Sequence, residues 1–267
     1  RQDVISQEDL IEEIARIYGY ENIPVSIPAI VPHAKSIEIR DIIGSLKQML
    51  VGLGLQEVIT HSLVDSNPLE ENAASIEVEN PLSEEQAMVR TTLIPSIGRC
   101  IAYNLNQKQD HIALFEIAKR FYETDGRINE EWALAIALCG ARSFLLAQGR
   151  VKDEMGVLHL KGILETIMSR LRIKDCQFVS SGGTSFKVMI GKEKVGVLSM
   201  LSEEQKGSVA IKNKEVCVAE LSVQKLVSFA QLKKQFVPLP LYPAITRDIS
   251  FVIKKELTVE ALVAAIR

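Results

Sequence analysis

The sequence predicts an α+β fold, in which antiparallel strand pairs and helices follow one another irregularly. Two long apolar segments, IALFEIAKRFYE and EEWALAIALCGAR, are separated by a turn that contains Asp125 and Gly126, which is typical of a β-hairpin. A second hairpin is expected in SFKVMIGKEKVGVLSML. Because strands and helices do not alternate regularly, a parallel βαβ sheet is not expected.

Two amphipathic helices are predicted in the first part of the chain. Apolar residues recur at the spacing of one helix face over residues 7–18, and Ser6 with Asp9 resembles a capping box at its start. Three prolines in ENIPVSIPAIVPHAKS then indicate a linker. Residues 37–53 form the second apolar helix pattern, which two glycines end.

The remaining elements of the main region follow from local patterns. LQEVITHSLVD alternates in the manner of a strand, and SIEVENP is expected to be a short strand. TTLIPSIGRCIAYNLNQ reads as a helix with a proline in its first turn, and GVLHLKGILETIMSRLRI is the clearest helix of the chain. EVCVAELSVQKLVSF is predicted to pass from a strand into a helix.

A second domain is expected to start near the end of the chain. The prolines of QFVPLPLYPAITRD interrupt the pattern, and ISFVIKKELTVEALVAAIR then predicts one strand and one helix. A lone strand and helix cannot bury a core of their own, so this segment is interpreted as the front of a truncated domain.

The composition bounds the class of protein. The chain has 267 residues, 47% of them apolar, and a formal net charge of −3, which suits one large domain or two ordinary ones. No apolar run reaches membrane-spanning length, and nothing resembles a signal peptide. The four cysteines and four histidines are scattered, which predicts isolated thiols in a reducing cytoplasm and no zinc site. The small net charge argues against nonspecific nucleic-acid binding by this piece alone.

The most acidic stretch, near the start of the chain, raises the question of a metal site. On the predicted helix Asp9, Glu12 and Glu13 share one face, and Asp3 lies just before the helix. Like charges at these spacings repel by about 0.2–0.5 kcal/mol per pair, which the helix dipole and Arg16 offset in part. On spacing alone, two interpretations stay open: a solvated helix face, or an oxygen-rich site for Mg²⁺ or Ca²⁺.

Local signatures of catalysis are missing from the sequence. It contains no Walker or dinucleotide phosphate-binding loop, no GxSxG and no local Ser/His/Asp or Cys/His pattern. SSGGTS is interpreted as a plain glycine turn, and His61 as a packed or edge residue of a strand. In the long hairpin, Glu116, Lys119 and Arg120 stand among apolar neighbours, which indicates a strand with one wet face.

Six stretches carry a family resemblance. They are RQDVISQEDLIEEIARIYGYENIP, GLQEVITHSLVD, NPLSEEQAMVRTTLIPSIGRCIAYNLNQ, LFEIAKRFYE, VGVLSMLSEE and PLYPAITRDISFVI. In this order and spacing they resemble the beta chain of bacterial phenylalanyl-tRNA synthetase, over a fragment from its C-terminal half. The resemblance covers nearly the whole chain.

The resemblance implies three parts. Residues 1–25 are similar to the C-terminal helix of a preceding small domain. Residues 26–236 resemble a noncatalytic core with the class II aminoacyl-tRNA-synthetase-like fold, an antiparallel sheet flanked by helices. Residues 237–267 resemble a linker and the start of a truncated ferredoxin-like domain that binds the anticodon.

The resemblance also implies a function. The beta core is expected to scaffold a catalytic alpha subunit in a cytoplasmic α2β2 heterotetramer, which charges phenylalanine tRNA with phenylalanine and binds ATP in the alpha subunit. No catalytic residue is assigned, and the fragment alone is expected to be inactive. Class II motifs 2 and 3 need arginines that stabilise charge at the phosphates, whereas the strand with Glu116, Lys119 and Arg120 lacks an FRxE pattern and no motif 3 is evident. Residues 37–53 occupy the place of motif 1, an intersubunit contact in this family.

For the acidic stretch, the resemblance favours the metal site over the solvated face. Positions that match Asp3, Asp9, Glu12 and Glu13 bind an Mg²⁺ ion shared with the alpha chain in this family. All four match in residue type and spacing.

Two other functions remain as alternatives. A stand-alone ligand-binding module related to biotin or lipoate ligases would need a glycine-rich ligand loop, which is missing. A metal-dependent hydrolase would need a metal-bound water and a nearby base, and the sequence indicates neither.

Overall fold

The structure, a computed structural model, describes residues 3–27, 39–65, 76–146 and 149–233, and also 236, 238, 242–243, 245–254, 257 and 259–266. The chain divides into two compact units, Arg1–Ala230 and Gln231–Arg267, and each is treated by itself. Within the described segments, every helix is too short or too polar to cross a membrane.

The long hairpin is the centre of the first unit. β5 (His111–Thr124) and β6 (Arg127–Leu146) pair antiparallel along the whole of β5. Asp125 and Gly126 form the turn with φ values of 52° and 70°, a left-handed conformation that these two residue types tolerate. The predicted hairpin and its turn are therefore confirmed.

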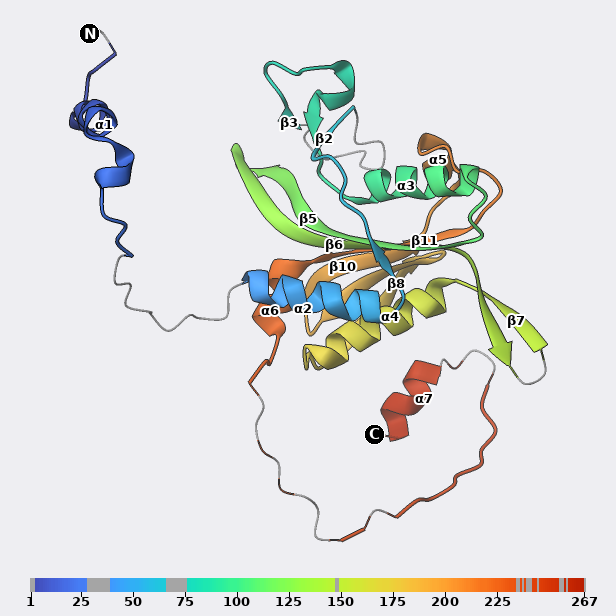
Figure 1. The fold of residues 1–267 in the computed structure, drawn as a ribbon. Coiled ribbons are helices and arrows are strands. Elements are labelled where there is room, and N and C mark those ends of the chain that lie inside the picture. Colours follow the sequence, from blue (N-terminus) through green and yellow to red (C-terminus); the bar gives the residue numbers. More distant parts are fainter. Residues whose placement is uncertain are drawn as a thin grey trace. The chain divides into compact units, whose positions relative to one another are not determined.

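The hairpin is extended into an eight-stranded sheet (Figure 1). The strand order is β1-β5-β6-β11-β10-β9-β8, and β7 pairs with the end of β6. The bounds are β1 Gln56–Glu57, β7 Gly149–Glu154, β8 Cys176–Gly182, β9 Ser185–Ile190, β10 Glu193–Met200 and β11 Val216–Ser222. Apart from β1, which lies parallel to β5, the described strands of this sheet pair antiparallel. A small second sheet has the order β2-β4-β3, with β2 Leu63–Val64, β3 Ile76–Glu77 and β4 Met88–Val89.

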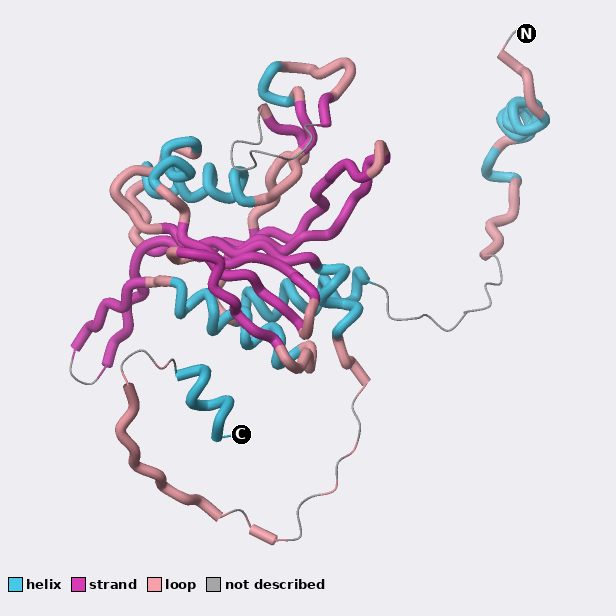
Figure 2. The backbone as a smooth tube through the Cα atoms, turned by 180° about the vertical axis from the view of Figure 1, so that it is seen from behind, coloured by secondary structure: helices cyan, strands magenta, loops and turns pink. Residues whose placement is uncertain are grey.

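Helices cover both faces of the large sheet (Figures 1 and 2). On one face lie α3 (Ile94–Asn106) and the short α5 (Glu203–Ser208). On the other lie α2 (Ile39–Gly52), α4 (Val157–Arg170) and α6 (Val223–Phe229). Each face has its own core of buried apolar side chains, so the unit has three layers.

The alternation along β6 explains the two cores. Leu134 and its alternate neighbours Ile136 and Leu138 point to the core beneath α2 and α4. The intervening alanines point to the core beneath α3. Helix α3 also packs closely against the end of α5, because a Cβ added at Gly98 would lie only 3.2 Å from a methyl carbon of Val209.

Helix α1 (Gln7–Tyr18) has the predicted capping box. Asp9 N–H donates to Ser6 Oγ at 3.3 Å, and the Asp9 carboxylate accepts the Ser6 N–H at 2.8 Å. The helix ends before Gly19, which has a φ of 90°, and a short 3₁₀ turn follows at Tyr20–Asn22. No residue of α1 is buried among the described residues.

Several short elements differ from the prediction. The strand expected in LQEVITHSLVD is present only as β1 and β2, two residues each. Between them the Thr60 N–H bonds the Glu116 side chain and not a neighbouring strand. Strands β4, β7 and β8 were not predicted. SSGGTS forms the predicted glycine turn, which joins β8 and β9 into a hairpin that was not expected. The first two residues of the predicted helix 37–53 lie outside the described residues.

The second unit contains α7 (Val259–Ile266), which confirms the predicted C-terminal helix. The strand expected in ISFVI is not formed, because residues 245–254 have no paired strand among the described residues. The start of a ferredoxin-like domain is therefore not confirmed.

The cysteines are isolated thiols, as predicted. Cys139 and Cys217 are buried on adjacent strands, but their side chains point into opposite cores. Burial raises the pKa of Cys217 to about 11, so this thiol is protonated at neutral pH.

Candidate functional site

A cluster of charged side chains lies on the sheet face that α3 covers. Glu116 and Arg120 of β5, Glu131 of β6 and Glu220 of β11 all occupy positions that alternate with residues of the opposite core. We call them, together with Arg90 after β4, the charged cluster. The strand with one wet face that was predicted for Glu116, Lys119 and Arg120 is wrong, because Glu116 is 1% exposed and Lys119 lies on the opposite face. The other three members of the cluster have no local sequence pattern and were not predicted.

The first half of the charged cluster is a fully buried ion pair. Arg90 Nη1 lies 3.0 Å from Glu116 Oε1, and both side chains are 2% exposed. Thr60 binds both partners: its hydroxyl donates to Glu116 at 2.8 Å and accepts from Arg90 at 2.9 Å, and its N–H donates to Glu116 at 3.1 Å. Arg90 Nε also donates to the carbonyl of Lys119 at 3.0 Å. These bonds offset the cost of removing two charges from water.

The second half of the charged cluster centres on Arg120. Its guanidinium donates to Glu131 at 2.8 and 3.1 Å and to Glu220 at 2.8 Å. Ser222 donates a short hydrogen bond to the other oxygen of Glu131. Glu220 also accepts the Leu93 N–H at 2.7 Å, so a carboxylate lies at the N-terminus of α3, where the helix dipole favours negative charge.

The charges of the cluster do not favour a phosphate. Two guanidinium groups face three carboxylates, and each guanidinium is bonded to at least one of these. Lys119 lies on the opposite face, where it pairs with Glu130 at 2.5 Å. The arrangement can therefore hold the hairpin, β11 and α3 together, but an anion placed there would meet a net negative charge.

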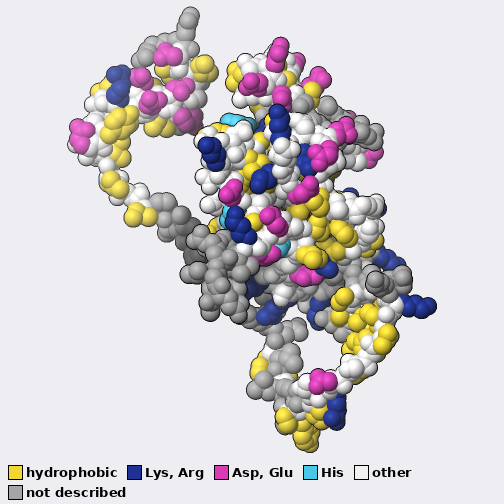
Figure 3. Space-filling model, turned by 90° about the vertical axis from the view of Figure 1, so that its right-hand side faces the viewer, with side chains coloured by type: hydrophobic (Ala, Val, Ile, Leu, Met, Phe, Trp, Pro, Cys, Tyr) yellow, Lys and Arg dark blue, Asp and Glu magenta, His cyan; other side chains and the backbone are white. Residues whose placement is uncertain are grey.

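The predicted metal ligands lie on and just before α1. Figure 3 shows acidic side chains exposed along this segment. Asp9 uses one carboxylate oxygen for the helix cap, and the N–H groups of Ser6 and Ile5 hold the pKa of Asp9 below its usual value. Glu13 pairs with Arg16 at 2.5 Å. Among the described residues, no three histidine, cysteine or acidic side chains are grouped so as to hold a metal ion.

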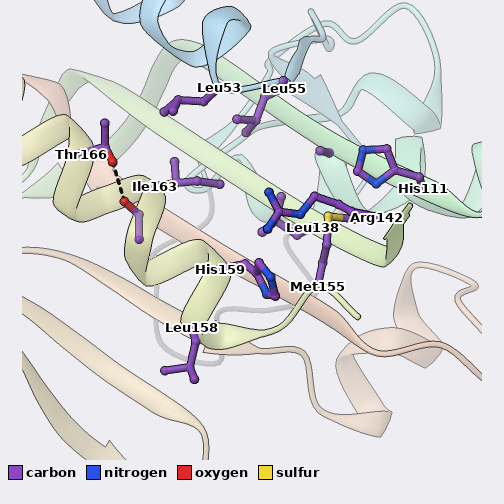
Figure 4. Close-up of a pocket in the computed structure, with 13 residues that line it drawn as sticks. Leu53, Leu55, His111, Leu138, Arg142, Met155, Leu158, His159, Ile163 and Thr166 are labelled. Carbon is purple, nitrogen blue, oxygen red and sulfur yellow. Dashed lines mark hydrogen bonds between the residues drawn. The ribbon is translucent and has the colours of Figure 1, made fainter. Parts of the chain in front are cut away.

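A pocket of about 390 Å³ lies between the C-terminal end of α2, β5, β6 and α4 (Figure 4). Its walls are mostly apolar, with His111, Arg142 and His159 at one side. His159 Nδ1 accepts the Gly156 N–H at 3.2 Å, so Nε2 carries the ring proton. This Nε2–H donates to the Asp153 carboxylate at 2.8 Å. Nothing in the sequence pattern had indicated this site.

The comparison with known proteins gives a family. A family model described as the phenylalanyl tRNA synthetase beta chain CLM domain matches residues 23–223. The phenylalanine–tRNA ligase beta subunit of Halalkalibacterium halodurans is 30% identical over 98% of this chain and 34% of its own length. That of Bacillus subtilis is 30% identical over 100% of this chain and 35% of its own length. The chain thus spans about a third of the length of the curated relatives it matches.

Solved structures agree on the fold. A pyrrolysyl-tRNA synthetase of Desulfitobacterium hafniense superposes with a TM-score of 0.56 and 16% sequence identity, over 72% of each chain. A second structure of that enzyme gives a TM-score of 0.55 at 16% identity, over 71% of this chain and 68% of the other. Over this part of the chain, the helix-flanked sheet therefore has the fold of these synthetase structures.

Proposed function

This chain belongs to the phenylalanyl-tRNA synthetase beta chain family, and from this premise we propose that it forms the noncatalytic core of the beta subunit. In this role it scaffolds a catalytic alpha subunit, which binds ATP and charges phenylalanine tRNA. The assembly is an α2β2 heterotetramer in the cytoplasm. The comparisons favour neither the stand-alone ligand-binding module nor the metal-dependent hydrolase.

The charged cluster is the observation that supports a noncatalytic role. Adenylate formation needs positive charge at the phosphates of ATP. Here Arg90 and Arg120 are bonded to Glu116, Glu131 and Glu220, so their charges are already balanced within the chain. These charged side chains therefore stabilise the structure of this chain, and catalysis is left to the partner.

The contact with the alpha subunit is proposed at α2 and β1. By the family resemblance, this helix and strand correspond to motif 1, an intersubunit contact. Val51 and Ile59 are 57% and 88% exposed although both are large and apolar, and Leu53 is 39% exposed. Strand β1 is an edge of the sheet with one described neighbour, β5. Covering these side chains and this edge would stabilise a subunit interface.

Asp3, Asp9, Glu12 and Glu13 are proposed to bind Mg²⁺ together with the alpha subunit. Carboxylate oxygens are the ligands that Mg²⁺ prefers, so the donor set fits. One oxygen of Asp9 is used by the cap and Glu13 pairs with Arg16, so these residues form no closed cage by themselves. An ion held between two chains would join them, and the remaining ligands would come from the partner or from water.

The division of the chain that we propose is the one that the family resemblance implies. Residues 1–25 would end a small preceding domain, 26–236 would form the synthetase-like core, and 237–267 would begin the anticodon-binding domain. In the full complex, the tRNA would be a partner of this chain.

Co-purification tests the proposal. The full-length beta chain is expressed with the alpha chain and purified in Mg²⁺ or in EDTA. We expect a stable complex that EDTA weakens, and that Glu12→Gln with Glu13→Gln weakens equally. Ser6→Ala is the matched control, because it removes the α1 cap but keeps every carboxylate.

The outcomes separate the two parts of the proposal. A complex that neither EDTA nor the Gln variants weaken would show that the acidic residues form a solvated helix face. The scaffold role would still hold in that case. Failure of the full-length chains to associate would overturn the scaffold role itself.

A further inference from the structure

Positive charge gathers at one end of the large sheet. Its first source is the segment RLRIK, where α4 ends. Leu171 and Ile173 are buried in the core at 4% and 8% exposure. The alternate positions Arg170, Arg172 and Lys174 are therefore exposed. A positive φ of 56° at Arg172 turns the chain sharply at this point.

The turn between β9 and β10 lies beside this segment. The Gly191 N–H donates to the carbonyl of Asp175 at 3.3 Å, which holds the turn against the connection from α4 to β8. Lys192 and Lys194 are exposed on the turn, whereas the following Val195 is 2% exposed and anchors it in the core.

Helix α6 adds a further cation. Lys225 Nζ donates to the carbonyl of Lys194 at 3.0 Å and lies 3.2 Å from Glu193. Figure 1 shows α4 ending on the side of the sheet where α6 lies. We call the set the basic end: Arg170, Arg172, Lys174, Lys192, Lys194 and Lys225. The segments that carry these cations, residues 170–175, 191–194 and 223–229, contain two carboxylates, Asp175 and Glu193. Six cations less two acids leave these segments with a net charge of +4, on a chain of −3.

The basic end lacks the apolar anchors of a protein interface. Between residues 159 and 231, Val179 is the one large apolar side chain that the described structure exposes, and it pairs with Lys187 in the middle of β8 and β9. Protein partners are bound mainly through aromatic and aliphatic anchors. A nucleic-acid backbone needs only cations, because counterion release supplies the affinity.

We propose that the basic end binds the phosphate backbone of an RNA. That this RNA is a transfer RNA rests on the proposed function, whereas phosphate binding follows from the charges. The small net charge of the whole sequence argued against such binding, but it averages over acidic residues that lie elsewhere, including those of α1.

Salt-dependent RNA binding tests the inference. The full-length beta chain is titrated with bulk transfer RNA at about 50–200 mM salt, a range over which phosphate contacts lose affinity steeply. The test variant is Lys174→Ala with Lys192→Ala. The control, Lys212→Ala with Lys214→Ala, removes equal charge from exposed sites just before β11, at the opposite end of the sheet.

We expect the test variant to bind more weakly and the slope of log K against log salt to become shallower by roughly 1.4–1.8, the loss of two phosphate contacts. The control is expected to keep the wild-type slope. Equal thermal melting of all three proteins shows that folding is unchanged.

Two results would overturn the inference. One is an equal slope in both variants. The other is normal RNA binding by the test variant together with lost binding of polyglutamate, which would indicate an acidic protein partner. Because the RNA titration omits the alpha chain, its outcome is independent of the co-purification.

Discussion

Arg120 on β5 and Glu220 on β11 form a 2.8 Å ion pair across β6, although 100 positions separate them in the chain. Glu220 also accepts the N–H of Leu93 at the start of α3. One carboxylate thus connects the hairpin, a central strand and a helix from the other layer. We expect this ion pair to stabilise the fold, because both side chains are largely removed from water, at 25% and 7% exposure.

Glu220→Gln should destabilise the fold by about 1–3 kcal/mol, because it removes a charged partner from Arg120 in a largely buried place. Urea unfolding measures the change. Glu130→Gln is the control, since Glu130 pairs with Lys119 at 2.5 Å but is 56% exposed. An exposed pair contributes at most about 1 kcal/mol. Equal losses in the two variants would contradict the structural role of Glu220.

Arg90 and Glu116 should show strong coupling. Arg90→Met or Glu116→Gln alone is expected to cost about 3–5 kcal/mol, because each orphans a buried polar partner. The double variant should cost clearly less than the sum, since no unpaired charge remains. A double-mutant cycle by chemical unfolding gives the coupling energy. Strict additivity of the two losses would show that the pair does not act as a unit.

The Asp153–His159 hydrogen bond predicts a pH effect. It holds the pKa of Asp153 below its ordinary value of 3.8. A carboxyl with a lowered pKa stabilises the folded state above its unfolded value, and this contribution is lost as the pH falls through the folded value. Asp153→Asn should therefore reduce stability near neutral pH and converge with wild type in acid. Unfolding midpoints against pH measure this.

The matched control for Asp153 is Asp125→Asn. Asp125 lies in the exposed hairpin turn at a φ that asparagine also tolerates. We expect this control to follow the wild-type pH profile. If it shifts the profile as much as Asp153→Asn, the effect belongs to surface charge in general and not to the bond with His159.

The sequence predicted those parts of the fold whose signal is local. The alternation in EEWALAIALCGAR follows from burial on both faces of β6, and Asp125 with Gly126 marks its turn. Arg90 was missed because a single arginine shows no partner until folding brings Thr60 and Glu116 to it. Strand β4 was missed for the same reason, since its partners β2 and β3 lie elsewhere in the chain.

The predictions of function depended on family resemblance more than on sequence pattern. On spacing alone the acidic face of α1 fits a solvated surface as well as a metal site, and only the family resemblance favours the metal site. The basic end combines α4, the β9–β10 turn and α6, which lie far apart in the sequence. A net charge cannot reveal such a cluster, because topology alone brings its members together.

Gly140, the single glycine of β6, should not tolerate a side chain. Its φ is 84°, and a Cβ added there would lie 1.9 Å from the carbonyl oxygen of Asp110. That oxygen accepts the N–H of Ala141, so it cannot move without breaking the end of the hairpin. Gly140→Ala is expected to cost at least about 3 kcal/mol, from left-handed strain and the backbone clash together. Gly162→Ala is the matched control: Gly162 lies within α4 with no atom within 4 Å of its added Cβ, so alanine should stabilise the helix by up to about 1 kcal/mol. Thermal and urea unfolding of both variants measure the difference, and a Gly140→Ala protein as stable as wild type would show that this end of β6 can rearrange around a side chain.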